Sequence, residues 1–229
     1  MKRVVISDLH LGNCSSNEGQ LLNFLSEIEC DQLILAGDII DFIRIPMFSD
    51  LTSQIFKIID NFQGEIIYIV GNHDIPLKAL VNTTLFGIQF KDFYEFIDNN
   101  KKIRIEHGDQ YEKGIVHHLA VMKVISIFQN IIESIFNIDL LSAWVKFRLK
   151  RRKLFNIWDM IVPEKKEDID VLIVGHTHTP EVIIWIDEFQ AIKTYINVGD
   201  WVQHTTYVTI ENGITRLKSY GGSHDRNIE

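Results

Sequence analysis

Cysteine is scarce in this sequence: the chain of 229 residues contains two, Cys14 and Cys30. Two thiols cannot form the framework of several disulfides that stabilises many small secreted proteins. The scarcity favours a reducing compartment, and we expect both cysteines to be free thiols with a structural role.

Long hydrophobic runs are also missing. The uncharged apolar stretch at residues 124–132 is much shorter than the roughly 20 residues that a helix needs to cross a bilayer, and so is the longest uncharged stretch, residues 79–90. Near the amino terminus, Asp8 and His10 interrupt the apolar residues too early for a secretory signal peptide. We therefore expect a cytoplasmic protein.

Positive charge is deficient in the chain as a whole but concentrated in one segment. The formal net charge is −8 at pH 7, which argues against a nucleic-acid partner. Residues 146–153, KFRLKRRK, nevertheless contain six basic residues out of eight. Since no linker divides the sequence, we expect a single domain over residues 1–229 that carries one basic patch.

The order of sequence patterns predicts an α/β fold. Apolar, β-branched runs predict strands at residues 3–7, 32–37, 65–70, 102–107, 170–175, 181–186, 191–198, 205–210 and 214–220. Apolar residues at three- and four-residue spacing predict helices at residues 18–30 and 49–62, and a long helical region at about 115–161. We predict a sandwich of two sheets, with a helical insertion at about residues 112–168 between its halves.

Polar residues follow five of the predicted strands, in the motifs SDLHLG, AGDIIDF, VGNHD, EHGDQ and VGHTHTP. They are Asp8, His10, Asp38, Asp41, Asn72, His73, Asp74, His107, Asp109, His176 and His178. Each motif alone is also typical of an ordinary turn or a capping side chain. Their combination indicates a metal site, in which we expect Asp74 and Asp109 to organise turns rather than to bind metal.

The VGHTHTP segment places His176 and His178 one residue apart. In an extended chain the two side chains would share a face, because side chains alternate along a strand. This spacing alone is compatible with one metal ion, two ions or none. The mixture of carboxylate, amide and imidazole groups suits Mn²⁺, Fe or Zn²⁺ better than Ca²⁺.

The five motifs, D-x-H, GD-x-x-D, GNHD, HGD and GH-x-H in that order, resemble the calcineurin-like metallophosphoesterase superfamily. The resemblance implies a four-layer αββα sandwich and two divalent metal ions, which we expect to be Mn²⁺, with Fe or Zn²⁺ as alternatives. It implies that one ion is held by Asp8, His10, Asp38 and His178, and the other by Asp38, Asn72, His107 and His176. It also implies that His73 faces the leaving group and that Asp41 orients His73, although Asp41 also suits an ordinary surface turn.

Within that superfamily, the chain is similar to the UDP-2,3-diacylglucosamine hydrolase group. The similarity rests on SDLHLG, GDIIDF, GNHD, HGDQYE, the insertion with its basic run, and a late VGDWV at residues 198–202. It implies hydrolysis of the pyrophosphate of UDP-2,3-diacylglucosamine to UMP and a lipid monophosphate, a step in lipid A synthesis, beneath a helical lid. We expect Lys146, Arg148 and Lys150 of the lid to bind substrate phosphates or to contact the inner face of the cell membrane peripherally.

Two other functions are compatible with the sequence. The best-known hydrolases of that group have arginine where this chain has His73, which leaves a soluble phosphodiesterase or phosphatase acting on nucleotides as an alternative. A metal-stabilised interaction module that docks on membranes through residues 146–153 is the third hypothesis. The protein-phosphatase branch is disfavoured because Asp41 is followed by Phe42 and Ile43 instead of arginine and glycine.

Overall fold

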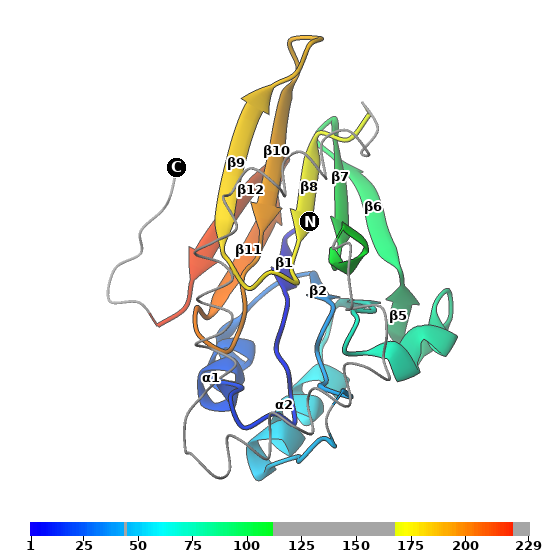
Figure 1. Ribbon diagram of the computed structural model, residues 1–229, viewed down its shortest axis with the longest axis vertical. Helices are drawn as coiled ribbons and strands as arrows, with labels where there is room; N and C mark the ends of the chain where they lie inside the picture. The colour runs from blue at the N-terminus through cyan, green and yellow to red at the C-terminus, as the bar shows by residue number, and fades with distance from the viewer. Residues whose placement is uncertain (44, 112–167, 222–229) are drawn as a thin grey trace. The chain divides into compact units, whose positions relative to one another are not determined.

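Two β-sheets and two α-helices dominate the part of the chain that the structure describes (Figure 1). The structure, a computed structural model, describes residues 1–43, 45–111 and 168–221. Helices α1 (Glu18–Glu27) and α2 (Asp50–Asp60) lie side by side and pack on the first sheet. The predicted α/β sandwich of two sheets is confirmed.

The first sheet has seven strands in the order β12-β11-β1-β2-β3-β5-β4. Their bounds are β1 (Arg3–Ile6), β2 (Gln32–Ala36), β3 (Glu65–Ile69), β4 (Thr84–Leu85), β5 (Ile88–Lys91), β11 (Thr206–Glu211) and β12 (Ile214–Ser219). Strands β1, β2, β3 and β5 are parallel, so the carboxyl ends of β1, β2 and β3 meet at one edge of the sheet.

The second sheet has five strands in the order β6-β7-β8-β10-β9. Their bounds are β6 (Phe93–Asp98), β7 (Lys101–Glu106), β8 (Val171–Val174), β9 (Glu181–Ile186) and β10 (Ile192–Asn197). Strands β7, β8 and β10 are parallel to one another, so their carboxyl ends also meet at one edge.

Both faces of the first sheet are buried. Towards the second sheet, side chains such as Val5 and Ile34 pack against Ile105 and Ile173. On the opposite face, alternate residues of the same strands pack against α1 and α2, as Leu33 does. Burial on both faces explains why β1, β2 and β3 are continuous apolar runs rather than alternating ones.

Polar caps fix the beginnings of the two helices. Asn17 accepts a hydrogen bond from the backbone of Gln20 and caps α1, whereas Ser49 and Thr52 form a reciprocal capping box at α2. Helix α1 ends three residues before its predicted end because the backbone at Ile28 is already extended toward β2.

Residues 71–101 contain elements that the sequence patterns do not predict: the 3₁₀ helix η1 (Ile75–Leu80) and strands β4, β5 and β6. These strands are largely half-exposed or exposed, so they lack the apolar runs that mark β1 to β3. A second 3₁₀ helix, η2 (Asp109–Tyr111), follows β7.

The predicted helical insertion at about residues 112–168 lies almost wholly outside the described residues, and with it Lys146, Arg148 and Lys150. The expectations for the lid therefore stay predictions. Of the helices within the described ranges, none combines the length and the apolar character that crossing a membrane requires.

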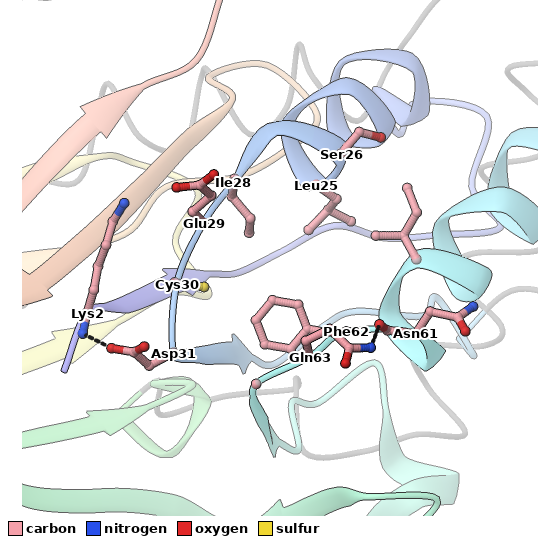
Figure 2. A pocket seen from close by; sticks show the side chains of 12 residues that line it. Lys2, Leu25, Ser26, Ile28, Glu29, Cys30, Asp31, Asn61, Phe62 and Gln63 are labelled. Atoms are coloured by element: carbon pink, nitrogen blue, oxygen red, sulfur yellow. Dashed lines mark hydrogen bonds between the residues drawn. The ribbon is translucent and has the colours of Figure 1, made fainter.

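A hollow of about 900 Å³ lies beside the amino-terminal end of β2 (Figure 2). It is lined by the ends of α1 and α2 and by Cys30, whose pKa burial raises to about 11. Cys14 and Cys30 are both free thiols, as expected. Because the polar motifs follow the opposite, carboxyl ends of the strands, this hollow is separate from the site that they predict.

Candidate metal centre

Five strands from both sheets direct their carboxyl ends toward one cluster of polar side chains. The cluster comprises Asp8 and His10 after β1, Asp38 after β2, Asn72 and His73 after β3, His107 after β7, and His176 and His178 after β8. Among these residues, Asp8, His10, Asp38, Asn72 and His107 are buried. The structure thus brings together the residues that the sequence singles out.

One group of ligand atoms is formed by Asp8, His10 and His178. Nε2 of His178 lies 3.2 Å from Nε2 of His10 and 3.3 Å from Oδ1 of Asp8. Ligands bound to one divalent ion at roughly 2.0–2.2 Å are themselves separated by about 3 Å, so this spacing is suitable for coordination.

A second group is formed by Asp38, His107 and His176. Nε2 of His107 lies 3.2 Å from Oδ2 of Asp38 and 3.1 Å from Oδ1 of Asn72. Asp38 also belongs to a candidate group with His10 and His73, which places its carboxylate between the two halves of the cluster.

A buried orphan atom supports the fit of a cation to these groups. Oδ2 of Asp8 accepts hydrogen bonds from the Ser7 hydroxyl and the backbone of His176, whereas Oδ1 is buried without a hydrogen-bond partner. A buried carboxylate oxygen without a hydrogen bond, at 3.3 and 3.9 Å from two imidazole nitrogens, would be satisfied by a cation bound to all three atoms.

The charges of the cluster also favour a bound cation. Burial alone would lower the pKa values of His107 and His178, but the carboxylates of Asp38 and Asp8 raise them to about 10 and about 9, respectively. Burial would raise the pKa of Asp8, but His178 lowers it to about 2. The carboxylates therefore create a negative potential that favours positive charge at this position.

Five residues of the cluster have left-handed backbone conformations, which non-glycine residues rarely adopt. They are Asp8, His10, Asp38, His176 and His178, with φ between 48° and 67°. Strain of this kind concentrates at functional sites, where the surrounding structure enforces it.

The backbone of His176 and His178 also corrects a prediction. Strand β8 ends at Val174, and the positive φ values of both histidines mean that VGHTHTP turns instead of continuing extended. The expectation that alternation along a strand aligns the two side chains is therefore wrong. Their directions are set by the turn, and His176 approaches His107 whereas His178 approaches Asp8.

Glycines in two motifs permit close packing around the cluster. A Cβ atom on Gly37 would overlap the ring of His107, and one on Gly175 would overlap Ser7 and Asp8. The GD and GH dipeptides therefore satisfy a steric requirement of the site as well as turning the chain.

Asp41 and His73 form a pair next to the cluster. Oδ1 of Asp41 lies 2.9 Å from Nδ1 of His73, and Nε2 of His73 lies 3.8 Å from Oδ2 of Asp38. Burial would lower the pKa of His73, but Asp38 and Asp41 raise it. The pair holds an imidazole with its Nε2 edge toward the candidate metal ligands.

Asp74 has the structural role that we expected. Its buried carboxylate accepts hydrogen bonds from the backbone N–H groups of Ile39, Ile40 and Gly71 and from the Tyr68 hydroxyl. It thereby ties the turn after β3 to the turn after β2, which carries Asp38.

Two further polar residues, to which the sequence motifs give no role, lie beside the cluster. The side-chain amide of Asn13 donates to Oδ2 of Asp41 (2.9 Å), and Asp200 in the VGDWV segment lies 3.7 Å from Nδ1 of His178. The sequence does contain a feature that could have identified Asp200: the Gly-Asp pair after β10 (residues 199–200) repeats the Gly-Asp pair after β2 (residues 37–38).

The sequence profile of the calcineurin-like phosphoesterase family matches residues 1–180. The chain belongs to this family. Calcineurin-like phosphoesterases are metal-dependent phosphoester hydrolases, and the two groups of carboxylate and imidazole atoms supply ligands for divalent cations. The family assignment and the enzymatic class predicted from the motifs are confirmed.

This calcineurin-like phosphoesterase is similar in sequence to a named hydrolase. UDP-2,3-diacylglucosamine hydrolase of Vibrio atlanticus (strain LGP32) is 27% identical over 229 residues, covering 88% of this chain and 90% of the relative. Two solved structures share the fold. Yfce, a phosphoesterase from E. coli, gives a TM-score of 0.53 at 13% identity over 99% of this chain and 97% of its own. Vps29 of Chaetomium thermophilum gives a TM-score of 0.54 at 13% identity, and the match covers 95% of this chain and 85% of Vps29.

Proposed function

We propose that this phosphoesterase cleaves the pyrophosphate bond of UDP-2,3-diacylglucosamine, giving UMP and a lipid monophosphate for lipid A synthesis. The observation that supports this substrate most is the similarity to a hydrolase of that name along 88% of the chain. The described site is compatible with the chemistry, because its candidate ligands form two adjacent groups that share Asp38 as a neighbour.

In this proposal Asp8, His10, Asp38 and His178 hold one ion, and Asp38, Asn72, His107 and His176 hold the other. Two such ions, which we propose are Mn²⁺, would supply Lewis-acid activation of a water molecule and of the phosphoryl oxygens when bound to these residues. Ser7 supports this arrangement because its hydroxyl holds Oδ2 of Asp8, which leaves Oδ1 as the ligand atom.

We propose that His73 acts on the leaving group. Asp41 binds Nδ1, so Nε2 is the nitrogen that carries or donates a proton toward the substrate. From this position the imidazole either protonates the departing oxygen as its bond to phosphorus breaks or stabilises the phosphoryl oxygens as a cation. Asn13 in turn holds the second oxygen of Asp41.

The purified protein, incubated with UDP-2,3-diacylglucosamine and Mn²⁺, is expected to release UMP and the lipid monophosphate in equal amounts. Chromatographic quantification of UMP measures the reaction, and a soluble phosphodiester such as bis(p-nitrophenyl) phosphate serves as the comparison substrate. Rapid turnover of the soluble diester without UMP release would refute the lipid substrate and favour the alternative discussed below.

The His73→Ala variant is expected to retain its metal ions but to lose turnover by about a hundredfold or more, since a positioned acid-base group contributes roughly 10²–10⁴. Metal content and kcat are measured on the same preparation. Asp41→Asn should lower turnover less, and combining it with His73→Ala should add no further loss, because Asp41 acts through His73. Additive losses in the double variant would contradict this relation.

A soluble phosphodiesterase or phosphatase acting on nucleotides is the second candidate function. The feature that favours it is His73 itself, which stands where the best-known hydrolases of the lipid group have arginine. We further propose a cytoplasmic location, with residues 146–153 contacting substrate phosphates or the inner face of the membrane.

A further inference from the structure

A second aspartate–histidine pair adjoins the cluster. Oδ2 of Asp200 lies 2.6 Å from Nδ1 of His204 and 3.7 Å from Nδ1 of His178. Asp200 is buried, whereas 41% of the His204 side chain is exposed. One carboxylate oxygen therefore contacts both a candidate metal ligand and a histidine that is accessible to solvent.

The two oxygens of Asp200 have different partners. Oδ1 accepts hydrogen bonds from the backbone N–H groups of Val202, Gln203 and His204, which is sufficient to fix the turn after β10. Oδ2 is directed to the two imidazoles and contributes nothing to those backbone bonds. A carboxylate needed only for the turn would not require this second set of contacts.

This pair has the same organisation as Asp41–His73. In each case a buried carboxylate holds Nδ1 of a partly exposed histidine, with Oδ1 also accepting a backbone N–H of its own turn. The contact through Nδ1 leaves Nε2 as the ring nitrogen suited to an external ligand. His73 adjoins Asp38 and His10, whereas the second pair adjoins His178.

The backbone beside His204 is strained and firmly held. Thr205 has φ of 50°, an unusual value for a β-branched residue. Its hydroxyl oxygen lies 2.8 Å from the His204 carbonyl and 2.9 Å from the Tyr220 carbonyl, either of which can accept its hydrogen, and its own carbonyl accepts from the Tyr220 backbone. These bonds fix the segment that presents the imidazole.

We propose that His204, positioned by Asp200, binds the second phosphate group of a diphosphate substrate, the one that is not attacked. This inference rests on the proposed function for the presence of two linked phosphates. An imidazole Nε2–H donates well to a phosphate oxygen, and the contact of Asp200 with His178 places His204 next to the cluster that would hold the reacting phosphate. His73 and His204 would then contact different phosphates of one substrate.

The test measures binding of two non-hydrolysable probes, methylenediphosphonate and methylphosphonate, to the Mn²⁺-loaded protein by calorimetry. His204→Ala is expected to weaken diphosphonate binding about tenfold, as loss of one charge-assisted hydrogen bond would, and to leave methylphosphonate binding within about twofold. Asp200→Asn should weaken diphosphonate binding in the same direction while preserving the turn, since an amide oxygen can still accept the backbone bonds.

Asp187→Asn is the matched control. Asp187 also accepts backbone N–H groups in a turn, from Phe189 and Ala191, but its side-chain ion pair is with Lys193. It should leave both affinities unchanged. If Asp200→Asn lowers thermal stability as Asp187→Asn does but leaves diphosphonate affinity intact, Asp200 is structural and its positioning role is refuted.

Turnover of a soluble diphosphate diester adds a kinetic readout. His204→Ala should raise KM with little change in kcat, because the interaction is made equally in the ground state and the transition state. The proposal would be overturned if His204→Ala weakened the binding of both probes equally, or if it weakened the binding of neither probe. These binding measurements remain decisive for His204 even if the wild-type protein releases no UMP from the lipid substrate, so the two proposals can fail separately.

Discussion

Replacing Asp38 by asparagine is expected to reduce phosphoesterase turnover by at least about a thousandfold. Losing a single donor to the transition state costs roughly 10²–10³ in other enzymes, and Asp38 is proposed to bind both metal ions. The substitution preserves an oxygen that can accept the hydrogen bond from the backbone of His73 (2.7 Å), so the fold is expected to persist while the negative charge is lost.

Metal content and the far-ultraviolet circular dichroism spectrum of Asp38→Asn are measured together with kcat. Asp8→Asn is the matched control: it also neutralises a buried carboxylate of the cluster but is proposed to affect one ion. We expect Asp38→Asn to weaken the binding of both ions and Asp8→Asn to weaken the binding of one ion. If Asp38→Asn binds two Mn²⁺ ions with the affinity of the wild type, Asp38 does not bridge them.

Replacing Asp74 by alanine is expected to lower the free energy of unfolding by about 3–5 kcal/mol. Its carboxylate receives three backbone N–H groups and the Tyr68 hydroxyl within the buried interior. Each buried donor left unpaired costs roughly 1–3 kcal/mol, reduced where water or relaxation of the backbone offers a new partner. Because these bonds join the turns that carry Asp38 and Asn72, the variant should also bind metal more weakly.

Urea unfolding with a chelator present measures this loss without a contribution from metal binding. Asp92→Ala, at an exposed aspartate between β5 and β6, is the control and should change the free energy of unfolding by less than about 0.5 kcal/mol. A loss below about 1 kcal/mol for Asp74→Ala would show that the four hydrogen bonds are replaced or unimportant.

The strands and the candidate ligands could be predicted because their signals are local. Val4, Ile34 and Ile67 belong to short apolar runs, each followed within a few residues by a turn and a polar side chain. Parallel strands place such turns at a common edge. This is why Asp8, Asp38 and Asn72 could be grouped before their distances were known.

Strands β4, β5 and β6 could not be predicted in the same way. Their residues are largely half-exposed or exposed, so the hydrophobic pattern is weak. They are stabilised by pairing: β5 with β3, β4 with β5, and β6 with β7. The residue pattern of VGHTHTP could not predict its backbone conformation either. A histidine pair one residue apart fits an extended segment as well as the turn that the chain adopts.

The amino-acid sequence alone specifies which residue types stand at the strand ends, and therefore the family and the candidate metal ligands. Which atoms meet depends on the packed chain: Asn13 binds Asp41, Oδ1 of Asp8 has no hydrogen-bond partner, and Asp200 lies between His178 and His204. Strand identity depends on neighbouring residues along the chain, whereas these contacts depend on strand order and on strained turns, which are fixed when the two sheets pack together.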